Sequence, residues 1–477
     1  MCSASRRAAN GPAGAGAVPH GASALDPIVA LARHVAHVSY DDLPPAAVAA
    51  TKTFLLDTLG VAIAGSGDPW APRLATVAGG WGDGREATVL GTAARLPALS
   101  AAVVNGYQIH GLEFDCVHEG AVVHPMATLV PAVLAEVERR GGVDGRRLIA
   151  ALALGVDVAT SLGVAAKGAM RFFRPANAGA FGAVAALGKL RDLDADALVH
   201  AFGILYGHVS GTLQPHVEGS MQLGVQVGFN ARGALTAVDL AAAGFAGPRE
   251  VLEGRYGYFR LFENGEWDMA PVLKDLGRTW RITELSHKPF PSGRLTHGVV
   301  DGILRLRAQH GFVASDVARV TARVPPLVAR LVGRPDVPAP GANYARLCLP
   351  FVAATALVRN RVDVPDFRGD ALTAADVHEV AKRVVVAPDG NPDENAIVPQ
   401  SLEIELQGGS RLALPLATVI GQPAAPLSRE QHLGKFRRCW TYGAARLTEG
   451  HRERLVEAVD RLETVGDVRE LIRLTVP

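Results

Sequence analysis

A helical period in the apolar residues of the first 275 positions is the feature that most constrains how this chain can fold. Segments 24–38 (ALDPIVALARHVAHV), 45–65 (PAAVAATKTFLLDTLGVAIAG) and 127–142 (ATLVPAVLAEVERRGG) place apolar side chains three and four residues apart. The second and third end in glycine, which commonly terminates helices. Because these segments are rich in alanine and glycine, helix backbones can approach closely. We therefore expect a compact helical core from about Leu25 to Asp275.

The pattern changes in the next part of the chain. Residues 316–328 (DVARVTARVPPLV) alternate apolar and polar side chains, and residues 401–416 (SLEIELQGGSRLALPL) do so around a Gly-Gly turn. This alternation predicts strands, the second stretch forming a hairpin. A short buried strand is expected at 381–388, with helices at 293–309 and 345–360.

Helical period returns in SREQHLGKFRRC (428–439) and RERLVEAVDRLETVGDVRELIRL (452–474). The predicted fold class is therefore mainly α. One large helical domain is built from both ends of the chain (residues 25–276 and 419–477), and an α+β lid domain (residues 277–418) is inserted between them. Residues 1–24 contain an Arg pair but no continuous apolar run, so we interpret them as a disordered tail rather than a signal peptide.

Composition excludes several classes of function. The chain of 477 residues has 48 Lys+Arg and 47 Asp+Glu, a formal net charge of +1, so no strong field attracts nucleic acid or an anionic membrane. The apolar run 148–166 contains Asp157 and is interpreted as a buried helix rather than a membrane span. Four scattered cysteines without a CxxC pair favour a reducing cytoplasm. A chain this apolar and weakly charged is expected to form a homodimer.

The stretch HGLEFDCVHEGAVVHP, from His110 to Pro125, concentrates three histidines, two glutamates and an aspartate in an otherwise apolar region. Three interpretations compete. A metal site is possible because His110 and Glu113 could share a helical face, but the HExxH pattern is absent. Histidines at helix ends can also simply bind carbonyl groups. Proton transfer fits best, since carboxylates and imidazoles near apolar walls have pKa values shifted toward neutrality.

Longer motifs around this stretch carry a resemblance. NGYQIHGLEFDCVHEGAVVHP resembles the signature NG..IH.LDFDD.H.....HP of the MmgE/PrpD family. Further segments match in order: FLLDTLGVAIAG, RFFRPANAGAFGAVAALGKL, GFAGPREVLEGRYGYF, HKPFPSGRLTHGVVDG and LSREQHLGKFR. The resemblance implies a helical domain capped by a lid, a homodimer, and catalysis without metal or organic cofactor. Known members eliminate water from or decarboxylate small polycarboxylates, and at least one is an epimerase.

The resemblance carries over catalytic roles to four residues. His124 would be the base or acid, and Asp115, together with Glu113, would orient it. Lys288 would hold a substrate carboxylate, and His297 would protonate the leaving group or the carbanion. Each also has a structural alternative, such as Lys288 being an exposed lid lysine and His297 only bonding a carbonyl. We expect His124 and Asp115 to face the cleft between the domains, close to Lys288.

The chain departs from the family pattern at several positions. Arg174 replaces a histidine, Leu223 a lysine, Leu331 a tyrosine and Cys116 an aspartate, while Glu113 replaces a shorter aspartate. Lost cations and donors leave fewer partners for substrate carboxylates, and an unpaired carboxylate in a dry pocket costs on the order of several kcal/mol. Arg174 could still hold one carboxylate. The expected substrate thus has one or two carboxylates, or one carboxylate and a carbonyl, together with an apolar part, unlike methylcitrate or cis-aconitate.

The remaining polar residues near these positions are weaker candidates for substrate binding. His208 and His216 could replace the lost lysine, His118 could contribute to the pocket, and Cys116 is interpreted mainly as inert filler. We expect His110 to point into the helical core, Glu119 to lie at the rim of the cleft, and no metal site to form.

Three functions follow, in order of preference. The first is a cofactor-free lyase, a dehydratase or decarboxylase that transfers a proton next to a carboxylate or carbonyl of a small organic acid. The second is an isomerase or epimerase that uses the same carbanion. The third is an inactive relative kept as a binding or scaffold protein, for which the lost polar groups argue.

Overall fold

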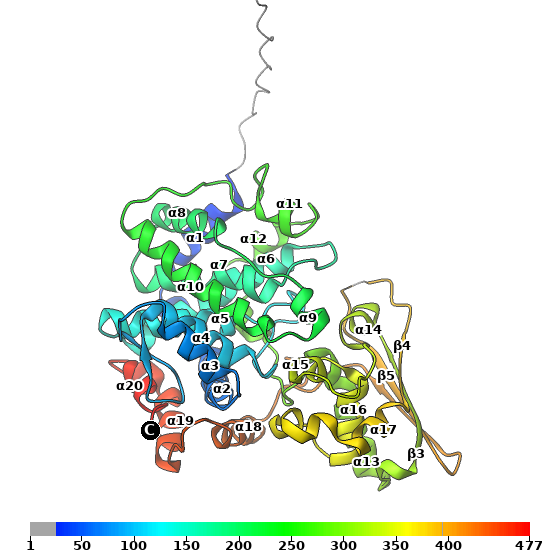
Figure 1. Ribbon diagram of the computed structural model, residues 1–477. Helices are drawn as coiled ribbons and strands as arrows, with labels where there is room; N and C mark the ends of the chain where they lie inside the picture. Colours follow the sequence, from blue (N-terminus) through cyan, green and yellow to red (C-terminus); the bar gives the residue numbers. More distant parts are fainter. Residues whose placement is uncertain (1–24, 394) are drawn as a thin grey trace, which may run out of the picture.

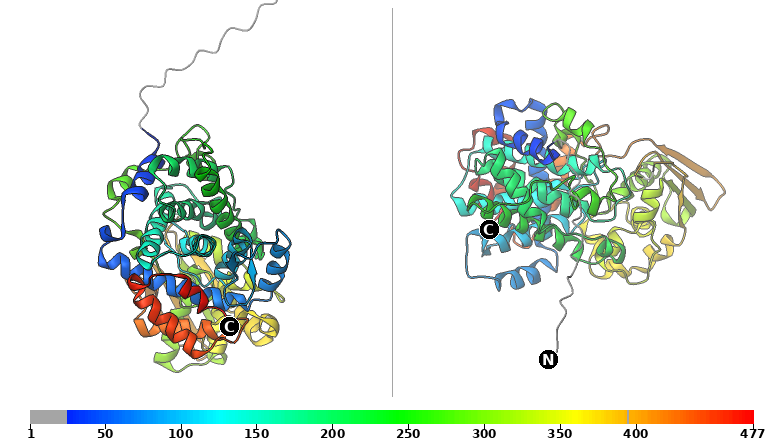
Figure 2. Two further views of the ribbon diagram at one scale, coloured as in Figure 1. Left: turned by 90° about the vertical axis from the view of Figure 1, so that its left-hand side faces the viewer. Right: turned by 90° about the horizontal axis from the view of Figure 1, so that it is seen from above.

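The computed structural model describes residues 25–393 and 395–477, so the tail predicted at residues 1–24 lies outside the described residues. A large helical domain and a smaller lid domain lie side by side (Figures 1 and 2). The last helices of the chain, coloured red, pack with the early helices rather than with the lid (Figure 1). This arrangement confirms the predicted fold class, a helical domain built from both ends of the chain with an α+β insertion.

The helical domain is formed mainly by helices of the first 275 residues. They are α1 (Pro27–His37), α2 (Pro45–Ser66), α3 (Ala71–Gly79), α4 (Ala98–His110), α5 (Pro125–Arg140), α6 (Gly145–Ala165), α7 (Arg174–Leu190), α8 (Ala195–Tyr206), α9 (Gln214–Glu218), α10 (Gln222–Ala242), α11 (Tyr258–Phe262) and α12 (Ala270–Asp275). The C-terminal part adds α18 (Arg429–Thr441), α19 (Glu449–Asp460) and α20 (Arg469–Arg473). Strands β1 (Ala87–Thr88) and β2 (Arg95–Leu96) form a small antiparallel pair.

Small residues let the central helices approach closely, as the alanine and glycine content predicts. Where α4 meets α10, a Cβ atom on Gly106 would lie 2.7 Å from the Cα of Gly228. Where α6 meets α7, a Cβ on Gly155 would lie 2.8 Å from the carbonyl oxygen of Gly182. Any side chain at these positions would force the helices apart, because interiors are close-packed.

Helices α2 and α6 are long and apolar enough to cross a membrane by length and composition. However, 72% of the apolar window in α2 and 94% of that in α6 is buried inside the protein. The prediction of a buried helix at residues 148–166 is therefore confirmed by α6.

The lid has its own core around a four-stranded sheet with the order β4-β3-β5-β6. β3 pairs parallel with β4 and antiparallel with β5, and β5 pairs antiparallel with β6. The elements of the lid are α13 (His297–His310), β3 (Val317–Val324), α14 (Pro326–Val332), α15 (Ala342–Arg346), α16 (Leu349–Arg359), α17 (Ala375–Ala381), β4 (Val384–Pro388), β5 (Gln400–Leu406) and β6 (Arg411–Leu416). Short 3-10 turns occupy Tyr40–Asp42, Arg281–Glu284, Arg294–Thr296, Ala314–Asp316, Val364–Phe367, Gly369–Thr373 and Leu462–Thr464.

The predicted hairpin is confirmed, and two other predictions for the lid need correction. The strand expected at 316–328 ends at Val324, because Pro325 and Pro326 follow and Pro326 begins helix α14. The helix expected at 345–360 is two helices, α15 and α16. Cys348 between them has extended backbone, and Pro350 stands in the first turn of α16.

Candidate active site

The loop between α4 and α5 (residues 111–124, the active-site loop) has a fixed backbone. An antiparallel bridge joins His118 to Val123, and another joins Val117 to Ser286 of the connecting segment (residues 285–293) that leads to the lid. The loop runs from the end of one helix to a helix that begins at Pro125, as expected. Glu113 has a φ of +52°, a left-handed conformation that non-glycine residues rarely adopt and that is often found at functional sites.

Two histidines converge on one buried carboxylate. Oδ2 of Asp115 lies 3.0 Å from Nδ1 of His110 and 3.1 Å from Nδ1 of His124. The two imidazole rings meet edge to face, with centroids 5.0 Å apart. His124 precedes helix α5, and its Nε2 has no hydrogen-bond partner among the described residues. Because a carboxylate only accepts hydrogen bonds, the Nδ1 atoms of both histidines carry protons. Nε2 of His124 is therefore the nitrogen that can accept a proton.

The charges of this triad follow from burial and from neighbouring groups. Burial opposes ionisation of Asp115, but His110 and His124 outweigh it and hold the pKa of Asp115 well below its usual value. Burial lowers the pKa of His124, which Lys288 lowers further and Asp115 opposes. For His110, burial is outweighed by Asp115 and Glu113, so its pKa is raised. His124 is therefore the neutral imidazole of the pair near neutral pH.

Glu113 and Lys288 form a buried ion pair beside the triad. Nζ of Lys288 lies 2.8 Å from Oε2 of Glu113, and the Lys288 side chain is fully buried. Burial would raise the pKa of Glu113, but Lys288, His110 and His124 together lower it to about 2. Lys288 is thus not an exposed lid lysine. Its ammonium is engaged by Glu113, which does not fit its expected role of holding a substrate carboxylate directly.

A cleft between the helical domain and the lid opens onto these groups. It encloses about 680 Å³ of space between atoms, part of it open to solvent. Its wall is mostly apolar and is supplied by both domains: Val117, Val122, Met170, Phe173, Pro175, Leu213, Gly293, Leu295, Leu327, Leu331, Val332, Leu347 and Ile397. Its polar lining residues are His110, Glu113, Glu119, His124, His216 and Arg294. His124 thus faces the cleft as expected, but Asp115 is fully buried and does not line it. His110 also borders the cleft instead of pointing only into the core.

Arg294 is a polar lining residue that the sequence analysis missed. Its Nε lies 2.6 Å from Oε1 of Glu119, and its Nη1 donates to the carbonyl of Ile420 at 2.7 Å. It stands in the segment HKPFPSGRLTH, between two residues that the family resemblance singled out. That position was the available signal, because a guanidinium beside a cleft is a natural anion-binding group. Glu119 is half-buried at the edge of the cleft, as predicted.

Two residues expected in the site have other partners. Both Nε and Nη2 of Arg174 are bound by Glu263, at 2.9 and 2.7 Å, and the pair is almost fully buried. Nε2 of His297 lies 3.2 Å from the carbonyl of Ser292, and burial, with Arg294 nearby, holds its pKa well below the usual value. Neither residue lines the cleft. The roles expected for them, carboxylate binding and protonation, do not fit this geometry, because internal partners occupy both groups.

Some of the weaker candidates for substrate binding line the cleft, and others do not. His216 and Leu331 line the cleft, and His216 lies 3.1 Å from Nη2 of Arg334. His118 instead accepts from the backbone N–H of Ala121 and contacts Glu284, so it stabilises the active-site loop. Three further residues lie away from the cleft lining: Leu223 and Cys116 in the buried core, and His208 on the surface.

The expectation that no metal ligands converge in this stretch is only partly met. Glu113 faces Lys288 and His118 faces Glu284. However, single ligand atoms of His110, Asp115 and His124 lie within 4.8 Å of one another. The observed hydrogen bonds through Nδ1 describe a carboxylate that orients two imidazoles, an arrangement suited to proton transfer.

Comparisons with known proteins agree with this architecture. Residues 29–270 match the MmgE/PrpD N-terminal domain, and residues 290–464 match the MmgE/PrpD C-terminal domain. The chain is 26% identical over 444 residues to the cis-aconitate decarboxylase of Mus musculus, which covers 89% of this chain and 88% of the relative. It is 25% identical over 468 residues to the cis-aconitate decarboxylase of Aspergillus terreus, covering 92% and 94%.

A third relative is the cis-aconitate decarboxylase-like protein oryM of Aspergillus oryzae, 25% identical over 471 residues, covering 93% of this chain and 96% of the relative. These relatives indicate an enzyme of the lyase kind. Because the two family matches together span most of its length, the chain belongs to the MmgE/PrpD family.

Proposed function

We propose that this protein is a cofactor-independent lyase that eliminates water from, or decarboxylates, a small organic acid with one or two carboxylates and an apolar part. The observation that carries the proposal is His124, which lines an apolar cleft, has its Nδ1 held by Asp115 and has no partner for Nε2 among the described residues. A neutral imidazole in this position can take a proton at Nε2 beside a substrate carboxylate, and the imidazolium that results can give it back.

The proposed chemistry uses His124 as the proton carrier. In an elimination, Nε2 takes the proton α to a carboxylate or carbonyl, and hydroxide leaves from the neighbouring carbon. In a decarboxylation, Nε2 of His124 first takes a proton from solvent, CO2 leaves, and the resulting carbanion takes that proton from the imidazolium. The buried charge of Asp115 stabilises the imidazolium in both cases and fixes the ring orientation.

The substrate class is argued from the lining of the cleft. Arg294 is the single Lys or Arg among the residues that line it, and most of the others are apolar. A guanidinium binds one carboxylate well, whereas each further carboxylate without a partner in such surroundings costs several kcal/mol. We therefore assign Arg294 the anchoring role first expected of Arg174. Glu119 binds its Nε, and the nitrogen assigned to the substrate is its Nη2, whose contact with the carbonyl of Val419 is 3.3 Å long. The cis-aconitate of the relatives' names, a tricarboxylate, fits this lining poorly.

A screen of organic acids tests this proposal. The purified enzyme is incubated in deuterium oxide with mono-, di- and tricarboxylic acids that carry or lack an apolar chain, and products are followed by mass spectrometry. Loss of water or CO2 from a mono- or dicarboxylate supports the proposal. Turnover of tricarboxylates alone contradicts the assigned substrate class. Deuterium exchange without loss of mass would instead identify an isomerase or epimerase, and no turnover of any acid would favour a binding protein.

The homodimer and the cytoplasmic location remain part of this proposal. Light scattering on the purified protein checks the first, with a mass of two chains as the expected result. Fractionation of cells that produce the protein checks the second.

A further inference from the structure

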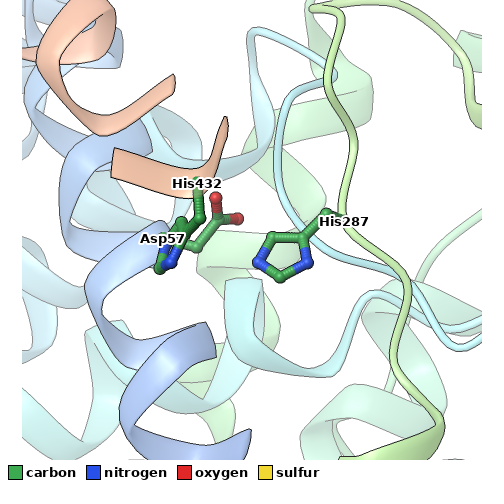
Figure 3. A group of neighbouring side chains, drawn as sticks. All are labelled: Asp57, His287 and His432. Atoms are coloured by element: carbon green, nitrogen blue, oxygen red, sulfur yellow. The ribbon is translucent and has the colours of Figure 1, made fainter. Parts of the chain in front are cut away.

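Figure 3 shows a second cluster of titratable side chains, Asp57, His287 and His432. It lies close to the active-site loop, because Lys435 contacts both Asp57 and the carbonyl of Phe114. Asp57 comes from α2, His287 from the connecting segment and His432 from α18. All three are buried, with 2%, 6% and 2% of their surface exposed, and single ligand atoms of the three lie within 4.8 Å of one another. The cluster therefore gathers two imidazoles and a carboxylate from three distant parts of the chain.

Several atoms of this cluster lack the partner that buried polar groups normally have. Nε2 of His287 and Nε2 of His432 are fully buried and make no hydrogen bond within the described part of the chain. Oδ2 of Asp57 is buried and unpartnered in the same way. Native structures rarely leave three such groups together, since each favours a partner in place of the lost water.

The ammonium of Lys435, next to the cluster, already has partners. Nζ of Lys435 lies 2.7 Å from Oδ1 of Asp57, so it occupies one oxygen of the carboxylate and leaves the other. The same ammonium donates to the carbonyl of Phe114 at 2.8 Å and lies 4.3 Å from the centroid of its ring. These contacts hold Lys435 on one side of Asp57, and the two imidazoles keep their nitrogen lone pairs available.

We propose that Asp57, His287 and His432 bind one divalent transition-metal ion of the Zn²⁺ class. Two imidazole nitrogens and one carboxylate oxygen form a donor set that suits this class of ion, and three protein ligands leave a position for water. None of these three ligands belongs to the triad of His110, Asp115 and His124, so the ion has no part in the proton transfer. The inference therefore does not depend on the proposed function.

The position of the ligands gives the ion a structural role. It joins the N-terminal part of the helical domain, its C-terminal part and the connecting segment. His287 directly precedes Lys288, whose ammonium binds Glu113 beside the cleft. A bound ion thus fixes the segment that leads into the lid and carries Lys288.

Metal binding by matched variants tests the proposal. Apoprotein is prepared with a strong chelator and titrated with Co²⁺, whose visible absorption reports nitrogen and oxygen ligation, and Zn²⁺ is then measured by elemental analysis. His287→Gln and His432→Gln each remove one ligand from a different segment. His208→Gln on the surface is the control, and His124→Gln removes a potential ligand of the other cluster. Circular dichroism and gel filtration verify that each variant is folded.

The expected result is one ion per wild-type chain, retained by His208→Gln and His124→Gln and bound at least tenfold more weakly by the other two variants. Zn²⁺ should raise the thermal midpoint of the wild-type apoprotein, because an ion that binds only the native state stabilises it. If one ligand variant does not fold, the other still decides the matter. Either of two results overturns the proposal: no binding and no thermal shift in wild type, or binding that only His124→Gln abolishes.

Discussion

Nδ1 of His124 lies 3.1 Å from Oδ2 of Asp115, a carboxylate with no exposed surface. The same oxygen lies 3.0 Å from Nδ1 of His110. Because Asp115 stays ionised and can only accept, it fixes the tautomer of His124 and turns Nε2 toward the cleft.

Asp115→Asn removes the charge that stabilises the His124 imidazolium and lets the ring adopt the other tautomer. We expect kcat to fall by at least about a hundredfold, since loss of the orienting carboxylate in comparable pairs is that severe. The change is nearly isosteric, so circular dichroism should be unchanged. Steady-state kinetics with a substrate from the acid screen measures the effect, and a loss of less than fivefold would contradict the role of Asp115.

The pH dependence of kcat/KM should follow the protonation of His124. Burial and Lys288 lower its pKa below the usual 6.5, and the base form is the active one in elimination. The rate is therefore expected to be constant at neutral pH and to fall only as the pH drops through this lowered value. In Asp115→Asn the acid limb should move to still lower pH, because Asp115 opposes the shift. If kcat/KM of the wild-type enzyme already fell with decreasing pH above pH 6.5, this would argue against His124 as the base.

Lys288→Met should destabilise the fold, because it leaves the carboxylate of Glu113 buried without its partner. Removing one member of a buried pair costs about 3–5 kcal/mol, whereas the double variant Glu113→Gln/Lys288→Met should lose less. Urea denaturation measures the free energy of unfolding of the single and the double variant.

The ion pair of Glu113 and Lys288 also makes the stability of the protein depend on pH. The pKa of Glu113 is lowered from 4.5 to about 2, so its stabilisation is full above pH 4.5 and is lost as the pH falls toward 2. Equal destabilisation of the single and double variants would show that the ion pair is not the cause.

Arg294→Lys and Arg174→Lys should have different effects, although both replace a buried arginine. We expect Arg294→Lys to raise KM on the order of tenfold, because one charge-assisted hydrogen bond to the substrate carboxylate is lost. Arg174→Lys breaks the two-point contact with Glu263, so it should lower the urea midpoint and leave KM unchanged. A raised KM in Arg174→Lys alone would restore the first expectation for Arg174.

The sequence predicted the architecture well where a local pattern reports a local structure. The helical period, the Gly-Gly hairpin and the helix start at Pro125 all depend on neighbouring residues, and the structure has each of them. The strand at 316–328 was predicted too long, because apolar alternation continues past Val324 while Pro326 starts a helix.

Partners distant in sequence could not be predicted in this way. Arg174 is bound by Glu263, 89 residues away, and Lys288 by Glu113, 175 residues away. A family position indicates which residue type is expected, but not whether an internal carboxylate already occupies it. Arg294 was missed for the same reason, since its place in the cleft depends on how the lid meets the active-site loop.

The turnover of His124→Gln tests the central claim most directly, namely that His124 carries the proton. With a substrate identified by the acid screen, kcat should fall by at least about a hundredfold relative to wild type, the loss typical of a missing general acid or base. Gel filtration and circular dichroism should match wild type, and the surface variant His208→Gln should keep full activity. A folded His124→Gln enzyme with near-normal kcat would contradict the account.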